Sequence, residues 1–351
     1  MPSGKRIVAG LSGGVDSSAA LLLLKRRGWQ PVGVSLLMAS WKGKCNSLRE
    51  NSCCTPEALA NARNVCRKLG VPYYVHDVRR QFEKRVMGYF LRELSAARTP
   101  NPCLVCNRDL KLRALFEWAK RHGIKHVATG HYAQVKDGKL LRAADMKKDQ
   151  TYGLCLLPRG VLSQLVLPLG KLTKEQVYSI AIKEGLGFYR GVRQSQDLCF
   201  VSEQAMKPFL FEKLGKREGP IVDEEGKRIG EHYGLFLYTV GQRKGLGFPT
   251  AHLVKGFDAK KNALIVTRER SRVLASNFSV KDFNWLVKPR AKKFRAMAQI
   301  RTHQPEVKAA VVRKGAALEI TCAQPIEGVA PGQICALYRG KRCIGGGTIS
   351  S

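Results

Sequence analysis

The sequence predicts an α/β protein in which a doubly wound, parallel-sheet domain is followed by a small β-rich central domain and a C-terminal β-barrel. Three observations support this prediction. An apolar run, a glycine-rich turn and a helical run succeed one another near the start, and strand and helix patterns go on alternating after them. From residue 208 the sequence is glycine-rich and β-prone, and toward the end short β-prone runs are separated by turn residues. We therefore expect domains at residues 1–207, 208–277 and 278–351.

The first strand, turn and helix are expected to form an anion-binding site. Residues 7–11 are an apolar run typical of a buried parallel strand, and residues 12–18 (SGGVDSS) turn the chain. Residues 19–24 (AALLLL) have high helix propensity. In such an arrangement the glycines let the backbone approach an anion, and the N–H groups of Ser17 and Ser18 point at it from the positive end of the helix.

The following elements alternate as a doubly wound sheet requires. We expect strands at 31–38, 71–76 and 125–129, and helices at 56–69, 81–97, 110–121 and 173–184, the last opened by a capping box. Ligands of such sheets bind beyond the carboxyl ends of the strands. Met38 ends the second strand, where it would pack on an adenine ring or in the core. Gly130, after the strand at 125–129, would let a ligand approach the backbone closely.

A cysteine pair follows the helix expected at 81–97. Pro100 and Pro102 end that helix and stiffen the segment after it. Cys103 and Cys106 then form a C-x-x-C pattern. In a reducing compartment this pattern indicates redox chemistry or metal binding.

Short β-prone runs at 294–302, 307–313, 317–322, 333–338 and 343–349 are the expected strands of the barrel. A basic run lies near its start, and we interpret it as a surface that contacts phosphates. Its members are Lys288, Arg290, Lys292, Lys293, Arg295 and Arg301.

Composition limits the class of protein and of partner. The chain has 351 residues and is 44% hydrophobic, enough for two or three domains with apolar cores. No apolar run approaches the ~18 residues of a membrane span, and the first ten residues do not resemble a signal peptide. We therefore expect a soluble, cytoplasmic protein without a membrane partner. Lysine and arginine number 61 against 27 acidic residues, a net charge of +34, which favours a nucleic acid as partner.

The eleven cysteines do not indicate a disulfide framework, because the number is odd and no secretory signal is present. Cys45, Cys53 and Cys54 lack zinc-finger spacing, and their role stays open. Five others are expected to be buried structural residues: Cys66, Cys155, Cys322, Cys335 and Cys343.

The turn SGGVDSS lacks the lysine of a Walker A loop and the spacing of a G-x-G-x-x-G loop. It resembles instead the PP-loop of the ATP pyrophosphatase superfamily, whose members split ATP into AMP and pyrophosphate. This resemblance implies that ATP and Mg²⁺ are bound, with Asp16 helping to hold the metal. The residues that fall on the ATP contacts are Gly10, Leu11, Ser12, Gly13, Gly14, Val15, Asp16, Ser17, Met38 and Gly130.

The chain resembles bacterial tRNA-specific 2-thiouridylases from end to end. The matching stretches are GLSGGVDSS, RTPNPCLVCNR, ATGHY, KKDQTY, SQDLCF, GLFLYTVGQRKGLG and the terminal APGQ and CIGGG. The resemblance implies a PP-loop domain, a small central domain and a β-barrel that together bind tRNA. It also implies ATP-dependent replacement of the C2 oxygen of the wobble uridine by sulfur, in tRNAs for Lys, Glu and Gln.

The resemblance also assigns roles to cysteines. Cys106 falls on the nucleophile position and Cys199 on the position that carries a persulfide; Cys106 would release the sulfur by forming a disulfide with Cys199. A cysteine desulfurase, a sulfur-relay protein or free sulfide would supply the sulfur. The residues that fall on tRNA-contacting segments are Asn101, Pro102, Cys103, Lys148, Asp149, Gln150, Arg301 and Thr302.

Cys103 departs from the pattern of many relatives, which have Asp at this position. Cys103, Cys106 and Cys199 are therefore three thiols that could ligate a [4Fe–4S] cluster with one open iron, which would hold hydrosulfide in place of the persulfide. The persulfide route, the cluster, zinc and a plain dithiol all stay open at this point. So do two other functions: a different PP-loop synthetase, and a non-catalytic RNA-binding protein.

Overall fold

The computed structural model describes residues 5–43, 45–46, 55–186, 198–302 and 304–350. Its Cα positions divide into two compact units. The first takes in residues up to 86, then 103–206 and 341–343, and the second takes in 87–102, 207–340 and the residues from 344 on. Cys53 and Cys54 lie outside the described residues.

A five-stranded parallel sheet in the order β3-β2-β1-β4-β7 forms the centre of the first unit. Its strands are β1 (Arg6–Gly10), β2 (Gln30–Leu37), β3 (Tyr73–Asp77), β4 (His126–Ala128) and β7 (Leu165–Val166). β1 lies in the middle, with Val8 opposite Val32 of β2 and Val127 of β4. The predicted parallel sheet is confirmed, and the carboxyl ends of β1, β2 and β4 therefore lie at the same edge of the sheet.

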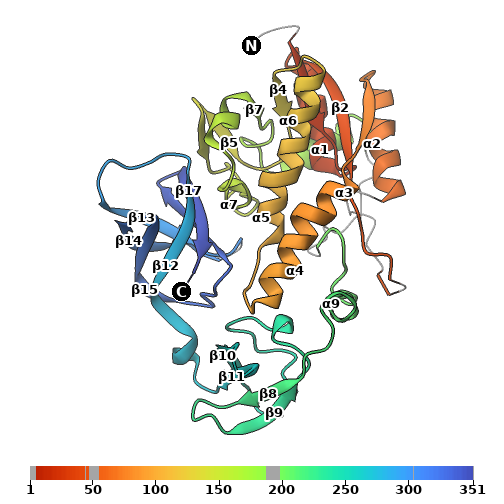
Figure 1. Ribbon diagram of the computed structural model, residues 1–351. Helices are drawn as coiled ribbons and strands as arrows, with labels where there is room; N and C mark the ends of the chain where they lie inside the picture. The colour runs from red at the N-terminus through yellow and green to blue at the C-terminus, as the bar shows by residue number, and fades with distance from the viewer. Residues whose placement is uncertain (1–4, 44, 47–54, 187–197, 303, 351) are drawn as a thin grey trace. The chain divides into compact units, whose positions relative to one another are not determined.

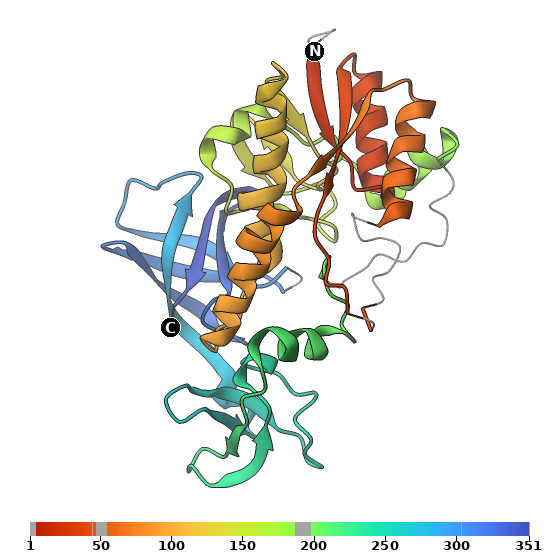
Figure 2. The same ribbon diagram turned by 45° about the vertical axis from the view of Figure 1, so that its right-hand side comes forward.

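Helices cover both faces of this sheet, as the predicted doubly wound fold requires. Figure 2 shows α6 on one side of the strands and α1 and α2 on the other. One apolar core joins the sheet to α1 and α2, and Cys66 belongs to it, as expected for a structural cysteine. The main helices are α1 (Val15–Arg26), α2 (Pro56–Lys68), α6 (Leu112–Arg121) and α8 (Lys174–Lys183).

One helical arm confirms the helix expected at 81–97, and a second arm begins earlier than predicted. The first arm comprises α3 (Arg79–Phe82), a π-helical turn η1 (Glu83–Met87) and α4 (Gly88–Ser95); the second comprises α5 (Pro102–Cys106), a π-helical turn η2 (Asn107–Lys111) and α6. The second arm was expected to begin at Leu110, but it begins at Pro102, because proline fits the first position of a helix, where its missing N–H costs nothing. Cys103 and Cys106 therefore lie on a helix.

The first unit also contains short elements that the sequence pattern does not predict. They are β5 (Gln134–Lys136), β6 (Lys139–Leu141), α7 (Thr151–Leu154) and the 3₁₀ turn η3 (Arg159–Gln164). Each is too short for a hydrophobic period to be recognisable. Cys155, directly after α7, is fully buried, as expected.

The second unit begins, in chain order, with α4 and the loop after it. Within this unit the Thr99 N–H donates to the Pro331 carbonyl (2.7 Å), and the Thr99 and Thr239 hydroxyls are 2.6 Å apart. A four-stranded sheet has the order β10-β11-β8-β9. The elements of this region are α9 (Met206–Leu214), β8 (Gly219–Val222), β9 (Arg228–His232), η5 (Leu235–Leu237), β10 (Leu253–Asp258), β11 (Ala263–Thr267) and η6 (Arg270–Val273).

An antiparallel β-barrel completes the second unit (Figure 1). Its strands are β12 (Leu274–Trp285), β13 (Lys293–Gln299), β14 (Val307–Lys314), β15 (Ala317–Glu327), β16 (Ile334–Arg339) and β17 (Arg342–Ile349). Pairing of β12 with both β15 and β17 closes it. Cys322 and Cys335 belong to its core and Cys343 is buried, as predicted, but β12 was missed. Polar residues and two register shifts interrupt the alternation of β12.

Candidate active site

The turn between β1 and α1 is closed by its own hydroxyl groups. The Ser17 Oγ accepts a hydrogen bond from the Ser12 N–H (3.2 Å) and donates to the Gly14 carbonyl (2.9 Å). Gly14 is the N-cap of α1, and in the described part of the chain no side chain caps this helix. The first N–H groups of a 12-residue helix therefore face the turn, and such groups bind anions.

A cavity of about 410 Å³ lies at the carboxyl ends of β1, β2 and β4, in front of this turn. Its position is the one at which parallel α/β sheets bind ligands. Met38, expected near an adenine ring, is one of its walls. The lining residues are Gly10, Leu11, Ser12, Asp16, Ser17, Val34, Leu36, Met38, Lys111, Leu112, Leu115, Thr129, Gly130, His131 and Gln150.

Close packing explains why two positions at the site are glycines. A Cβ on Gly130, which lines the cavity, would stand 2.8 Å from both the Asp16 carbonyl carbon and the Ser17 nitrogen, so the missing side chain also lets the backbone of the turn pack closely here. Gly13 has φ +76°, and a Cβ there would stand 2.2 Å from the Ala58 carbonyl oxygen. No other residue fits these positions without moving the turn.

Asp16 receives two hydrogen bonds on the same oxygen. Its Oδ1 accepts from the Tyr132 hydroxyl (2.8 Å) and from the Lys174 Nζ (2.6 Å). Among the described residues both contacts fall on Oδ1, and Asp16 lines the cavity, so Oδ2 remains for a ligand. Burial raises the pKa of Tyr132, and the nearby Asp16 charge raises it further, so Tyr132 acts as a donor. One such carboxylate oxygen fits Mg²⁺, which proteins bind through one or two carboxylates together with substrate phosphates.

The lining of the cavity also carries a positive charge and a neutral imidazole. Lys111 comes from the π-helical turn η2. The Thr129 Oγ1 and the His131 Nδ1 are 2.8 Å apart. Burial, together with the charge of Lys111, lowers the pKa of His131 to about 4, so this imidazole is neutral near pH 7. The cavity therefore offers backbone N–H groups, one carboxylate and one lysine to a polyanion.

Cys106 ends α5, directly before the π-helical turn, and is buried, whereas Cys103 is exposed. Because a π-helix repeats its contacts at five-residue spacing, Lys111 lies one turn from Cys106. The same turn is held by Asn107, whose Nδ2 donates to the Gly153 carbonyl (2.9 Å), and by Arg85, which donates to the Asp109 carbonyl (2.9 Å). Cys106 is thus connected to the cavity wall through a fixed helical turn.

Cys199 is half-buried in a turn. The next residue, Phe200, accepts hydrogen bonds at its carbonyl from the Trp41 N–H (3.0 Å) and the Asn46 Nδ2 (3.2 Å). Its ring packs edge-on against Phe82 (5.6 Å between centroids). Trp41 and Asn46 belong to the segment that leaves the cavity wall after β2, so the Cys199 turn is anchored to that segment.

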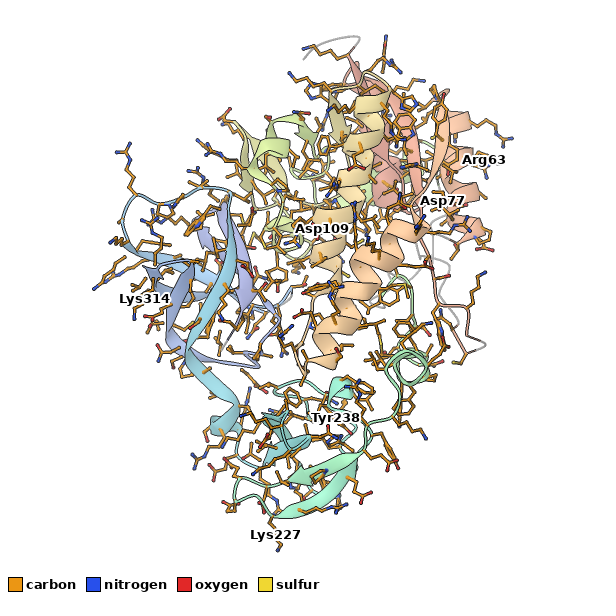
Figure 3. All side chains as sticks on the ribbon, viewed as in Figure 1. Arg63, Asp77, Asp109, Lys227, Tyr238 and Lys314 are labelled. Carbon is orange, nitrogen blue, oxygen red and sulfur yellow. The ribbon has the colours of Figure 1, made fainter. Side chains whose placement is uncertain are left out.

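A second cavity, of about 750 Å³, shares Met38 with the first. Lys42, Arg79 and Arg80 line it. Asp77, which Figure 3 labels where β3 ends, accepts hydrogen bonds from the Arg79 guanidinium (2.6 Å to Oδ2). That contact lowers the pKa of Asp77. Glu83 also lines this cavity, so its wall carries charges of both signs.

No group of three or more His, Cys, Asp or Glu side chains in the described part of the chain is placed to hold a metal ion. Cys103, Cys106 and Cys199, proposed above as ligands, thus do not form a metal-binding group there. In the described residues there is therefore no assembled ligand group for a [4Fe–4S] cluster or a zinc ion.

The segment at 148–150 is tied into the first unit by its middle residue. The Asp149 carboxylate pairs with Arg142 (2.9 Å) and accepts from the Ala143 N–H (2.8 Å), and both charged side chains are less than a tenth exposed. Gln150 lines the cavity and exchanges hydrogen bonds with the Tyr132 backbone. Lys148 therefore sits on a fixed loop.

In the second unit, Arg301 and Thr302 border a separate cavity with Gln304 and Glu327. The Arg301 guanidinium donates to the Gly328 carbonyl (3.0 Å), so this predicted RNA contact also has a partner within the unit. The other basic side chains at the start of the barrel are exposed: Lys288, Arg290, Lys292, Lys293 and Arg295.

Sequence reasoning missed three residues at the site: Lys111, Tyr132 and Lys174. Lys174 lies within the predicted capping box, which is confirmed between Thr173 and Gln176. Because the capping box explains these residues as the start of a helix, the sequence offers no reason to assign Lys174 to the site. Only the proximity of Lys174 to Asp16, 158 positions away in the chain, reveals it.

Family models match nearly the whole chain. A model described as "tRNA methyl transferase HUP domain" matches residues 5–203, a "PRC-barrel domain" model of the same series matches 207–268, and an "Aminomethyltransferase beta-barrel domain" model matches 275–349. No described helix is both long and apolar enough to cross a membrane.

Curated relatives match over similar lengths. The "tRNA-specific 2-thiouridylase MnmA" of Roseiflexus castenholzii is 38% identical over 374 residues, covering 98% of this chain and 99% of that protein. The protein of the same name from Thermus thermophilus is 40% identical over 358 residues, covering 98% and 95%. Among solved structures, a 4-thiouridine synthetase in complex with RNA and ATP is 18% identical with a TM-score of 0.39, covering 60% of this chain and 50% of that one. A TM-score of 0.39 is too low for this similarity to support a conclusion about the fold or the site.

Proposed function

Because this chain belongs to the family of tRNA-specific 2-thiouridylases, we propose that it replaces the C2 oxygen of the wobble uridine of tRNA by sulfur at the expense of ATP. One observation carries the proposal: the uncapped N-terminus of α1 faces a cavity that also holds a carboxylate and a lysine. Together these groups suit the triphosphate of a metal–nucleotide complex. Such an enzyme is a sulfurtransferase, and its substrate implies the cytoplasm.

In the proposed site the turn from Gly10 to Ser17 binds ATP, with Met38 and Gly130 in contact with the nucleotide. Magnesium, when bound with ATP, neutralises phosphate charge and leaves the α-phosphorus open to attack. Asp16 would hold the metal through Oδ2, since Oδ1 accepts from Tyr132 and Lys174. Backbone N–H groups of the turn would stabilise the departing pyrophosphate.

The proposed chemistry has two stages. In the first, the C2 oxygen of uridine attacks the α-phosphorus of ATP, and pyrophosphate leaves with the electron pair. In the second, the terminal sulfur of a Cys199 persulfide attacks C2, and AMP leaves with the oxygen. The Cys106 thiolate then attacks Cys199 Sγ, which leaves the sulfur on the base and a disulfide between the two cysteines. A thiol reductant resets this disulfide, and a cysteine desulfurase, a relay protein or sulfide supplies new sulfur.

The positions of the two cysteines support these roles. Cys106 is connected to the cavity wall by the π-helical turn that carries Lys111, and Cys199 is anchored to the segment that follows β2. The uridine must leave its stack to be reached, which costs little in a loop of single-stranded RNA.

The contacts with tRNA extend this proposal beyond the cavity. We propose that Asn101, Pro102 and Cys103 contact the tRNA, as do Lys148–Gln150 and Arg301–Thr302. Asp149 and Arg301 would act mainly by holding their segments, since both have partners inside the protein. Tight binding to tRNA is consistent with the net charge of +34.

A [4Fe–4S] route has less support, because in the described part of the chain Cys103, Cys106 and Cys199 form no metal-binding group. We assign no step to a cluster. Anaerobic reconstitution with iron and sulfide separates the two routes: about four irons per chain and charge-transfer absorption would favour the cluster.

The test is mass spectrometry of nucleosides from 2-thiouridine-deficient tRNA after incubation with the protein, MgATP and sulfide or a persulfide donor. We expect 2-thiouridine together with AMP and pyrophosphate. Cys106→Ser and Cys199→Ser should lose at least ~100-fold in thiolation with the persulfide donor while keeping tRNA-stimulated pyrophosphate release. Cys45→Ser is the matched control, since Cys45 is exposed and has no proposed role. Full thiolation by Cys106→Ser would contradict the mechanism, and tRNA-independent AMP formation would indicate another synthetase.

A further inference from the structure

Lys174 presents its ammonium group to the back of the predicted metal ligand. Its Nζ lies 2.6 Å from Asp16 Oδ1, and the whole residue is only 5% exposed. Lys174 does not line the cavity that Asp16 faces, whereas Asp16 does. The carboxylate therefore stands between a buried cation behind it and the nucleotide cavity before it.

The position of this ammonium is fixed from several sides. Its Nζ lies 4.7 Å from the centre of the Tyr178 ring and 5.7 Å from that of Tyr132. Aromatic faces attract a cation, most strongly where water is excluded. The backbone N–H of Lys174 donates to Asp145 Oδ2 (3.0 Å) at the start of α8. Lys174 is thus built into the fold as the partner of Asp16.

This pairing changes what Asp16 can bind. A lone carboxylate in a cavity attracts any divalent cation, but here the Lys174 charge already balances that of Asp16. A metal ion bound to Asp16 alone would face the Lys174 ammonium across the carboxylate, and Lys111 in the cavity lining adds a second positive charge that repels it. The phosphates of ATP bring several negative charges and further oxygen ligands, which offset that repulsion.

We propose that Lys174 makes Asp16 a conditional metal ligand, which takes a divalent cation only together with ATP phosphates. The proposal rests on the ATP site proposed above and adds an order of binding to it. Tyr132 also orients the Asp16 carboxylate, because its hydroxyl donates to the same oxygen, Oδ1 (2.8 Å), which leaves Oδ2 directed toward the cavity. Lys174 and Tyr132 are positioning residues in this account.

Binding of Mn²⁺, used in place of Mg²⁺ and followed by electron paramagnetic resonance, tests the proposal on the full chain. The wild type should bind about one Mn²⁺ in the presence of α,β-methylene ATP, and at least tenfold more weakly without it. Lys174→Met, which keeps the apolar stem and removes the charge, should bind Mn²⁺ without nucleotide at least tenfold more tightly than the wild type. A merely structural role of Lys174 would not produce such a gain.

The controls remove charge or contact separately. Lys171→Met removes an exposed lysine three positions away and should behave as the wild type. Lys174→Arg keeps the charge and should keep Mn²⁺ excluded, and adding Asp16→Asn to Lys174→Met should abolish the gained binding. Equal Mn²⁺ affinity of the wild type with and without the nucleotide would overturn the proposal, even if Lys174→Met does not fold. So would a folded Lys174→Met that gains no binding. Failure of the wild type to bind the nucleotide at all would instead overturn the proposed ATP site.

Discussion

The backbone of Gly130 packs directly on the backbone of Ser17: a Cβ on Gly130 would stand 2.8 Å from the Ser17 nitrogen. One residue belongs to the segment after β4 and the other to the first turn of α1. The contact joins the two strand ends between which the cavity opens, so the shape of the turn depends on the absence of a side chain at position 130.

Gly130→Ala should therefore weaken binding of α,β-methylene ATP about tenfold, because the turn must move to make room for the methyl group. Isothermal titration calorimetry measures the effect. Gly160→Ala is the matched control, since a Cβ there meets nothing within 4 Å. Unchanged nucleotide affinity of a folded Gly130→Ala would show that the turn does not bind the nucleotide.

Asp149→Asn should lower the free energy of unfolding by about 3–5 kcal/mol, because it leaves the buried Arg142 guanidinium without its charged partner. Lys148→Ala, next to it in the chain, should change stability by less than ~0.5 kcal/mol and yet weaken tRNA binding. Urea unfolding and filter binding separate the two effects. Equal stability of the two variants would mean that the Arg142–Asp149 pair does not hold the loop.

Stability should fall as the pH is lowered from about 6.5 to about 4, in part through His131. Burial lowers the pKa of this residue to about 4, whereas an unfolded histidine titrates near 6.5. Between these values the unfolded chain takes up a proton that the folded chain does not, which favours unfolding. Urea titrations at pH 7.5, 5.5 and 4.5 should give a shallower decline for His131→Gln than for the wild type. Burial also lowers the pKa values of three other histidines, whose contributions are the same in both proteins and cancel in the comparison: His76, His126 and His232.

Alkylation should distinguish exposed from structural cysteines. Burial raises the pKa of Cys66 to about 12 and also raises the pKa values of Cys322 and Cys335. Iodoacetamide at pH 8 should therefore modify the exposed Cys103 in the folded chain, and these three only after addition of urea. A time course of peptide mass spectra provides the readout. Labelling of Cys66 at the rate of Cys103 would contradict the buried position.

The basic surface at the start of the barrel predicts a strong salt dependence of tRNA binding. Replacing Lys292, Lys293 and Arg295 together by alanine should weaken binding and lower the slope of log K against log salt by about 0.7–0.9 per lost phosphate contact. Replacing Lys227, Lys260 and Lys261 of the central sheet region removes the same charge and is the control. Equal slopes for the two triple variants would contradict the assignment of this surface to tRNA binding.

Much of the fold could be predicted because its signals are local. The glycine turn between an apolar strand and a helix, and the alternation after it, are properties of short windows, and the parallel sheet is confirmed. Strand β12 was missed because polar residues and register shifts hide its alternation. The helix that begins at Pro102 was missed because proline was interpreted as ending the preceding helix, although α4 already ends at Ser95 and proline also fits the first position of a helix.

The site was harder to predict where it depends on distant pairs. Ser12, Asp16 and Ser17 are neighbours in a motif, so their shared position follows from the sequence. Lys174 and Tyr132 reach Asp16 from 158 and 116 positions away, and no local pattern contains that information. The roles of Cys106, Cys199 and the tRNA-contacting segments stay predictions.

Residues 87–102 belong to the second compact unit, although residues 103–206 after them belong to the first. Thr99, in this stretch, is bonded to Pro331 and Thr239. A recombinant fragment that stops after residue 203 would therefore carry α4 without η5, which α4 contacts. In chimaeras between this chain and a relative, residues 87–102 and 207–340 should come from the same parent. A single crossover near residue 207 would combine α4 of one parent with the β-structure of the other.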